Sequence, residues 1–192
     1  MKRVFIITIA LFGVSGVFDV KAQNNGVENS FWGVQTGLLG VWAHSETRLT
    51  NKLAFRTEAG IDAGFWYTKS TWFGENSGYA LIPVLTLEPR LYYNILKRQT
   101  KGKSIVHNSA NYLSLKTSVH PSFGIVSDKS EVNGDLLILP SWGIRRSIGR
   151  HFNYELGLGA GYDYIFPKNG VRDHGEFVIG LNLRIGYSHK IR

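Results

Sequence analysis

Long segments of this chain alternate between apolar and small or polar residues, and this alternation constrains the fold more than any other feature. In residues 177–188, one face carries apolar side chains from Phe177 to Tyr187, and the other is mostly small or polar and includes Arg184. Successive side chains of a β-strand point to opposite faces, whereas a helix repeats every 3.6 residues. The segment is therefore predicted to be a strand with one apolar face.

Six further segments follow the same pattern and are also predicted to be strands. They cover residues 31–45, 53–67, 81–91, 113–125, 135–147 and 153–166. In residues 31–45, Trp32, Val34, Leu38 and Trp42 are expected on one face. Most of these strands would be about 11–16 residues long, well above the usual five or six. A tilted strand needs roughly 9–11 residues to cross a bilayer.

Turns or loops are expected between these strands. The predicted ranges are 46–52, 68–78, 96–109, 127–133, 148–151 and 167–175. Asn133-Gly134 and Asn169-Gly170 are favourable hairpin dipeptides. Bacterial single-chain barrels have even strand numbers. We therefore expect eight strands, the eighth arising from residues 23–31 or from the division of one of the seven segments.

The N-terminal segment has the three zones of a secretory signal peptide. Lys2 and Arg3 precede an apolar run from Val4 to Phe18, and Val20-Lys21-Ala22 resembles a cleavage site. An N-terminal membrane anchor is the alternative, but the apolar run is short for a helical span. Residues 1–22 are thus predicted to be a signal peptide and residues 23–192 the mature domain.

Export and composition exclude several classes of function. The chain has no cysteine, which excludes a disulfide scaffold and a thiolate metal site. Its net charge is +8, but an exported protein does not meet DNA or RNA, so no nucleic-acid partner is expected. Long alternating strands with an export signal predict an all-β fold, a single antiparallel up-and-down transmembrane β-barrel. A soluble β-sandwich is the alternative.

Several stretches resemble the small outer-membrane β-barrel domain proteins of Gram-negative bacteria. They are residues 33–62, 85–98, 111–118, 141–162 and 181–187. The resemblance implies location in the outer membrane, contact with its lipid and lipopolysaccharide, and insertion by the barrel-assembly machinery. It does not imply one activity. We expect a monomer without cofactor or metal.

The alternation assigns a balanced set of charges to the inner face. These residues are Arg56, Glu58, Asp62, Glu88, Arg90, Lys116, Arg145, Glu155, Asp163 and Arg184. The lumen of an eight-stranded barrel is just wide enough to be filled by side chains, and buried charges must be paired. We therefore expect an ion-paired plug and a non-enzymatic role in envelope structure or surface interaction. A narrow polar pore or proton relay is the alternative.

Other motifs suggest chemistry more weakly. His120 and Ser122 lie two residues apart on one predicted strand, as in outer-membrane lipid A deacylases, and are the candidate catalytic residues of a hydrolase. Gly157, Gly159 and Gly161 match part of a dinucleotide motif but lie inside a strand, where they cannot open a helix. Basic residues in the 96–109 loop are interpreted as a solvated turn or a contact with anionic headgroups: Lys97, Arg98, Lys101 and Lys103.

Overall fold

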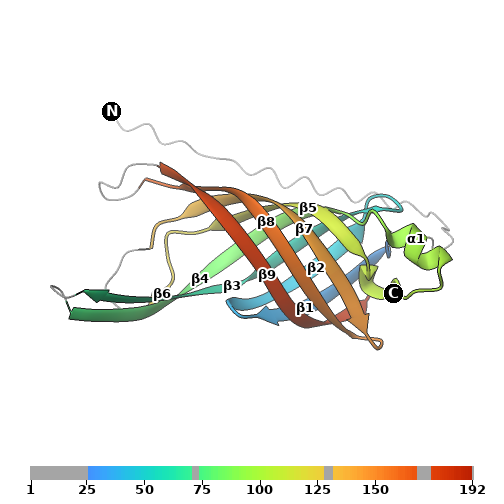
Figure 1. Ribbon diagram of the computed structural model, residues 1–192, viewed down its shortest axis with the longest axis horizontal. Helices are drawn as coiled ribbons and strands as arrows, with labels where there is room; N and C mark the ends of the chain where they lie inside the picture. The colour runs from blue at the N-terminus through green and yellow to red at the C-terminus, as the bar shows by residue number, and fades with distance from the viewer. Residues whose placement is uncertain (1–25, 71–73, 128–131, 168–173, 192) are drawn as a thin grey trace.

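The computed structural model describes residues 26–70, 74–127, 132–167 and 174–191, with the side chains of residues 66–76 excepted (Figure 1). The predicted signal peptide, residues 1–22, lies outside this part of the chain. Strands dominate the described residues. Their bounds are β1 Ser30–Gly37, β2 Gly40–Arg48, β3 Leu53–Ser70, β4 Gly74–Leu91, β5 Asn111–His120, β6 Ile125–Val126, β7 Asp135–Ile148, β8 Phe152–Ile165 and β9 His174–Lys190. Two short helices, α1 Ile95–Thr100 and the 3₁₀ helix η1 Val106–Asn108, lie between β4 and β5.

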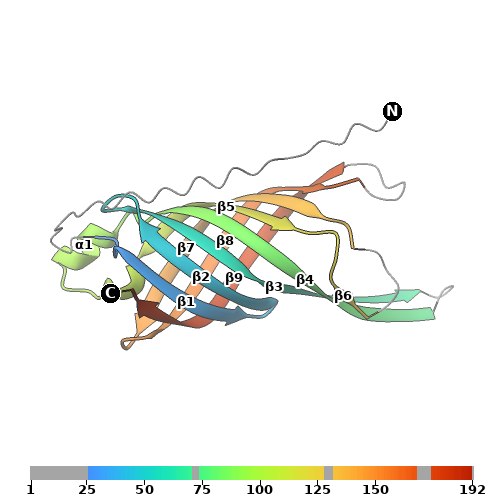
Figure 2. The ribbon, with the colours of Figure 1, turned by 180° about the vertical axis from the view of Figure 1, so that it is seen from behind.

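Eight of the strands form a closed antiparallel ring. Each ring strand pairs with its neighbours along the chain, β5 pairs with β7, and the first strand, β1, pairs with the last, β9. The short β6 adds only to β4. The strands run obliquely around the ring in both views (Figures 1 and 2). The predicted all-β, antiparallel, eight-stranded arrangement is confirmed.

The eighth strand comes from the division of residues 31–45 into β1 and β2. Gly37 pairs with Gly40 across Leu38 and Leu39, so the chain reverses there. Gly40 has a φ of 151°, a conformation that favours glycine. Cross-strand partners share a face, and Trp42 is paired with the buried Gln35. The prediction that Trp42 shares a face with Trp32 and Val34 is wrong, because Trp42 points inward and is 6% exposed.

The two faces of the ring differ sharply in polarity. Every ring strand exposes large apolar side chains on the outside, for example Trp32, Val41, Ile61, Leu85, Leu115, Trp142, Leu158 and Leu181. Every ring strand also buries polar or charged side chains on the inside, for example Gln35, Glu46, Arg56, Arg90, Ser118, Arg145, Glu155 and Arg184. A soluble protein has the opposite distribution, with charged groups outside.

Several predicted boundaries are wrong, and two of the differences are large. Strands β3 and β4 extend to Ser70 and from Gly74, so most of the predicted loop 68–78 is a hairpin arm. The predicted strand 113–125 ends at His120, and Ser122 lies beyond it on the exposed surface. The ring wall is therefore much taller at β3 and β4 than at the β1–β2 hairpin.

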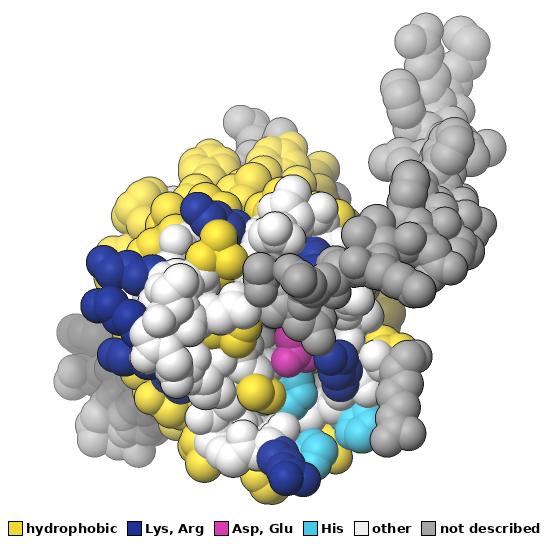
Figure 3. All heavy atoms as spheres, turned by 90° about the vertical axis from the view of Figure 1, so that its right-hand side faces the viewer, with side chains coloured by type: hydrophobic (Ala, Val, Ile, Leu, Met, Phe, Trp, Pro, Cys, Tyr) yellow, Lys and Arg dark blue, Asp and Glu magenta, His cyan; other side chains and the backbone are white. Residues whose placement is uncertain are grey.

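The connection between β4 and β5, residues 92–110, closes one end of the ring and is called the lid below. Helix α1 of the lid is at the right of Figure 1, and this end of the molecule faces the viewer in Figure 3. Beneath it lies a small apolar core that includes Val27, Ala54, Tyr92, Ile95 and Tyr112. Lys97, Lys101 and Lys103 on this connection are exposed, as predicted for a solvated turn, but His107 and Asn108 at the end of the predicted loop are buried. No helix in the described residues has the length and apolarity needed to cross a membrane.

Candidate functional site

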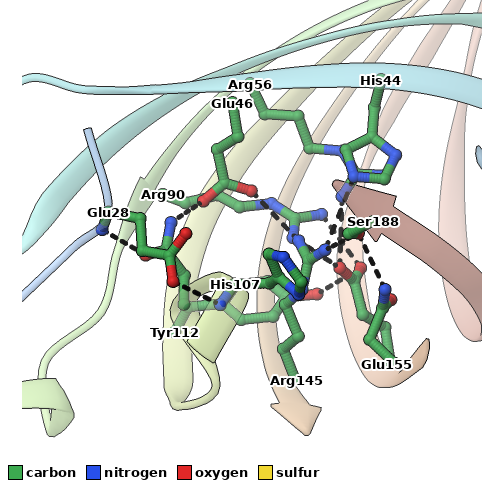
Figure 4. A network of polar contacts seen from close by, with 12 residues as sticks. Glu28, His44, Glu46, Arg56, Arg90, His107, Tyr112, Arg145, Glu155 and Ser188 are labelled. Carbon is green, nitrogen blue, oxygen red and sulfur yellow. Dashed lines mark hydrogen bonds and ion pairs between the residues drawn. The ribbon is translucent and has the colours of Figure 1, made fainter. Parts of the chain in front are cut away.

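The interior of the ring is organised around the carboxylate of Glu155 on β8. Its Oε1 lies 3.2 Å from Arg56 Nη1, 3.1 Å from Arg90 Nη1 and 3.0 Å from Arg145 Nη1. These arginines come from β3, β4 and β7, so one carboxylate joins four strands (Figure 4). All four side chains are almost fully buried.

Three further glutamates compensate the arginines around this centre. Arg90 Nη2 lies 2.8 Å from Glu88 Oε2, and Arg145 Nη1 lies 3.2 Å from Glu46 Oε2. The carboxylate of Glu58 contacts Arg56 and, at 2.6 Å, Arg184 Nη1. The buried network thus contains four arginines and four glutamates: Arg56, Arg90, Arg145, Arg184, Glu46, Glu58, Glu88 and Glu155. Burying ionised groups is costly unless each is paired and hydrogen-bonded, and this balance meets that requirement.

Neutral side chains complete the network. Arg56 Nη2 donates to Gln35 Oε1 at 2.7 Å, and Gln35 Nε2 donates to Asn153 Oδ1 at 2.8 Å. Ser188 Oγ accepts from both Asn153 Nδ2 and Arg145 Nη2. These bonds connect β1, β3, β7, β8 and β9 across the ring, so the network is one continuous polar structure and not a set of separate pairs.

The network continues into the lid through Glu46 on β2. Tyr92 OH donates to Glu46 Oε1 at 2.8 Å, and Asn108 Nδ2 donates to the same oxygen at 2.5 Å. Burial, with the nearby Glu46 carboxylate, raises the pKa of Tyr92 well above its usual value. The phenol therefore stays protonated and keeps donating to Glu46.

The N-terminal segment is fastened to the same part of the lid. The backbone N–H of His107 donates to Glu28 Oε1 at 3.0 Å, and the backbone N–H of Glu28 donates to Asn108 Oδ1 at 2.7 Å. Burial, followed by the positive charge of Arg145, lowers the pKa of His107 to about 4. His107, itself part of the lid, is thus neutral at physiological pH.

Tyr112 packs beside the centre of the network. Its ring lies under the Arg90 guanidinium, with Cζ 4.4 Å from the ring centroid, and its hydroxyl is 3.5 Å from Glu155 Oε2. The opposite strand leaves room for this ring only because residue 143 is glycine, where a Cβ would overlap Tyr112. Gly143 therefore shapes the site, although it has no side chain of its own.

The half of the ring away from the lid contains a separate polar cluster around His120. His120 Nδ1 lies 2.6 Å from Asp135 Oδ1, and His120 Nε2 lies 3.1 Å from Asp62 Oδ2. Trp42 Nε1 donates to the other oxygen of Asp62 at 2.6 Å. Both ring nitrogens of His120 are thus held by carboxylates. The structure brings His120 to Asp62 and Asp135, with Ser122 past the end of β5.

Seven of the ten charges assigned to the interior are buried in the structure: Arg56, Glu58, Glu88, Arg90, Arg145, Glu155 and Arg184. Asp62, Lys116 and Asp163 also lie on the inner side but are half-buried nearer the open end. The interior set predicted from the alternation contains only charged residues, so it omits Gln35, Asn153 and Ser188, although the pattern does place Asn153 and Ser188 on the polar face. It also omits Glu46. The predicted loop 46–52 contains Glu46, whereas the structure has it on β2, because the β1–β2 hairpin shifts the strand to Arg48.

Comparison with protein-family models, with curated proteins and with solved structures finds no match. In the described part of the chain, no group of three or more His, Asp or Glu side chains is placed to hold a metal ion.

Proposed function

We propose that this chain is an integral outer-membrane β-barrel protein with a plugged lumen and a non-enzymatic role in the cell envelope. The observation that carries the proposal is the reversed polarity of the ring. Large apolar side chains surround all eight strands, while the interior holds a balanced ionic network. In lipid this arrangement buries the charges and leaves apolar groups in contact with acyl chains, as in outer-membrane barrels.

Ring closure supports insertion in lipid. A bilayer offers no water to backbone N–H and C=O groups, so a sheet that spans it must have no free edges through most of its height. Here β1 pairs with β9 over Phe31 to Gly37, and β3 pairs with β4 along their full lengths. These ladders provide that closure from the lid to the β1–β2 turn.

The surface at the lid end suits a membrane–water interface. Tyr93 and Trp142 are exposed, and Trp142 Nε1 donates to Tyr93 OH at 3.0 Å. Next to them, Lys97, Arg98, Lys101, Lys103 and Arg146 line a shallow depression, and basic side chains gather along one edge of this end in Figure 3. Interfacial aromatics and cations commonly mark the headgroup level. We infer that the lid faces the periplasm, with these cations near anionic headgroups.

The plug supports a structural role more than transport or catalysis. The four arginines and four glutamates fill the ring beneath the lid, and the lid itself contributes Tyr92 and Asn108 to them. A path for ions would have to break several buried ion pairs at once. His120 gives both ring nitrogens to carboxylates, which leaves it poorly suited to activate Ser122.

Two measurements test the proposal. Outer-membrane fractions carrying the protein should show a band that migrates differently on gels before and after boiling. The purified protein in planar bilayers should give no stepwise conductance. Recovery of the protein in a soluble periplasmic extract would contradict membrane insertion. Steady ion conductance by the folded protein would contradict the plugged lumen.

A further inference from the structure

A cavity of about 480 Å³ occupies the ring on the side of the ionic network away from the lid. Glu88, Arg90 and Tyr112 form its floor, and Lys116 and Arg184 lie in its walls. Much of the remaining wall is apolar, with Leu137 and Leu139 on β7 and the glycine-rich backbone of β8 and β9. The volume lies within the range of small-molecule sites.

Lys116 is the unusual charge in this cavity. Three cations among the described residues line the cavity, Arg90, Lys116 and Arg184, and Lys116 is the one of them that makes no ion pair within 4 Å. Its acidic neighbours are already engaged. Asp62 binds Trp42 and His120, Glu58 binds Arg56 and Arg184, and Glu88 binds Arg90. An ammonium in a half-buried, mostly apolar cavity is stabilised by an anion at contact distance, and the carboxylates near Lys116 contact other groups instead.

The cavity also lies beside a side opening in the wall. The β1–β2 hairpin stops at Leu38 and Leu39, which line the cavity. Beyond this turn, β9 residues 174–183 pair with β8 on one side only, and β3 residues 64–70 pair with β4 on one side only. No described strand lies between these two edges. We call this gap the seam.

The seam runs along an apolar stretch of the outer surface. Phe177, Ile179 and Leu181 on β9 are 71%, 69% and 84% exposed, and Phe65 on β3 is 70% exposed. If the protein spans a membrane, this stretch faces acyl chains, so the seam connects the lipid with the cavity. A ligand that enters there would keep its apolar part in an apolar environment throughout.

We propose that the cavity binds a single-chain anionic amphiphile of the fatty acid type. The carboxylate pairs with the Lys116 ammonium, the first part of the chain packs on Leu137 and Leu139, and the rest leaves through the seam over Leu38 and Leu39. This inference rests on the proposed membrane location. The ionic network and the lid by themselves support only a closed interior, whereas the cavity supports the binding of a ligand.

Trp42 provides a reporter for the test because it lines the cavity and is only 6% exposed. The other four tryptophans, Trp32, Trp66, Trp72 and Trp142, are replaced by phenylalanine. The protein is refolded into nanodiscs of zwitterionic phospholipid and titrated with dibromostearic acid, whose bromine atoms quench tryptophan on contact. Saturable quenching of Trp42 is expected.

Lys116→Met should raise the half-saturating concentration about tenfold to a hundredfold, the effect of losing a charged hydrogen bond. The matched control is Lys101→Met on the exposed surface of the lid. This variant should have the same half-saturating concentration as the parent protein. The corresponding dibromo alcohol should bind the parent protein more weakly than the acid and should be insensitive to Lys116→Met. Because Lys116 has no ion pair to lose, its variant should unfold in urea at an unchanged midpoint.

Three results would overturn the inference: no saturable quenching, equal binding of acid and alcohol, or equal binding by the parent and Lys116→Met. Quenching of Trp42 by brominated phospholipid in the disc would also overturn it, because the cavity would then admit two-chain lipids. A gel shift on boiling is recorded on the same samples. Absence of that shift would contradict the proposed function as well, whereas a retained shift without quenching would contradict the ligand alone.

Discussion

The ring of Tyr112 on β5 lies directly against the backbone of Gly143 on β7, its register partner across the strand pair. This contact aligns the aromatic face with the Arg90 guanidinium and directs the hydroxyl toward Glu155. A residue without a side chain thus sets the position of an aromatic ring at the centre of the ionic network.

Gly143→Ala should destabilise the protein, because the added methyl group overlaps a fully enclosed ring that has no room to move. Overpacking of this kind costs about 1–3 kcal/mol. Urea unfolding in detergent micelles, followed by tryptophan fluorescence, measures the change. Gly64→Ala is the matched control, since a Cβ there has no atom within 4 Å. Equal midpoints for the two variants would contradict the role of Gly143.

Glu155→Gln should be the most destabilising conservative change in the interior. It leaves Arg56, Arg90 and Arg145 converging on a neutral amide, and breaking a buried ion pair from one side costs about 3–5 kcal/mol. Glu176→Gln is the control, because that side chain is 62% exposed. The same unfolding assay applies, and a loss below about 1 kcal/mol would show that the arginines find other partners.

Lowering the pH should weaken the folded state through His107. The pKa of His107 is lowered to about 4 by burial and by neighbouring positive charges, including Arg145. In the unfolded chain His107 takes up a proton near pH 6.5, but in the folded protein it does so only near pH 4. Above pH 6.5 both states hold a neutral His107, so the free energy of unfolding is not reduced by it. As the pH falls from 6.5 towards 4, proton uptake favours the unfolded chain, and the free energy of unfolding falls by up to about 1.4 kcal/mol per pH unit.

His107→Asn should remove this part of the pH dependence. Asparagine tolerates the left-handed backbone that residue 107 adopts, with φ at 48°, so the lid can keep its shape. Unfolding midpoints of the parent and the variant are compared at pH 7 and pH 4.5. The exposed His189 provides the control, His189→Asn. A parent protein with the same stability at both pH values would contradict the assignment.

Tyr92→Phe should loosen the lid. The variant removes one of two donors to Glu46 Oε1 while the carboxylate stays buried, which costs about 1–3 kcal/mol. Hydrogen exchange should accelerate in residues 92–110, with little change in β7 and β8. Tyr79→Phe, at an exposed site on the tall side of the wall, should leave the lid unaffected. Unchanged exchange in the lid of Tyr92→Phe would show that the apolar core alone holds it.

The period-two pattern predicted the fold well because it reports directly which side chains face the interior. It identified most of the interior charges from Arg56 to Arg184 without any knowledge of their partners. It failed at Leu38-Leu39, since an apolar pair in the middle of a hairpin lacks the Asn-Gly or Asp-Gly signal of a tight turn. Gly37 and Gly40, which flank this pair, are the residues in the sequence that indicate a turn.

The lid and the cavity could not be predicted in the same way. The lid depends on contacts between residues far apart in the sequence, such as Glu28 with His107 and Glu46 with Tyr92, which no local pattern encodes. The cavity depends on differences in strand height around the ring. Lys116 looked like one member of a balanced set, and only the pairing of its neighbours with other groups distinguishes it.

The junction of β1 with β9 has a consequence for how the molecule assembles. Until these strands meet, each is an open edge able to pair with another chain. Their residues are separated by almost the whole sequence, so the last step of closure carries a large entropic cost. The lid holds Glu28, two residues before β1, through two hydrogen bonds: the Glu28 N–H donates to the Asn108 side chain, and the His107 N–H donates to the Glu28 carboxylate. The lid therefore ties the entry to the first strand to the middle of the chain by contacts that do not involve the last strand.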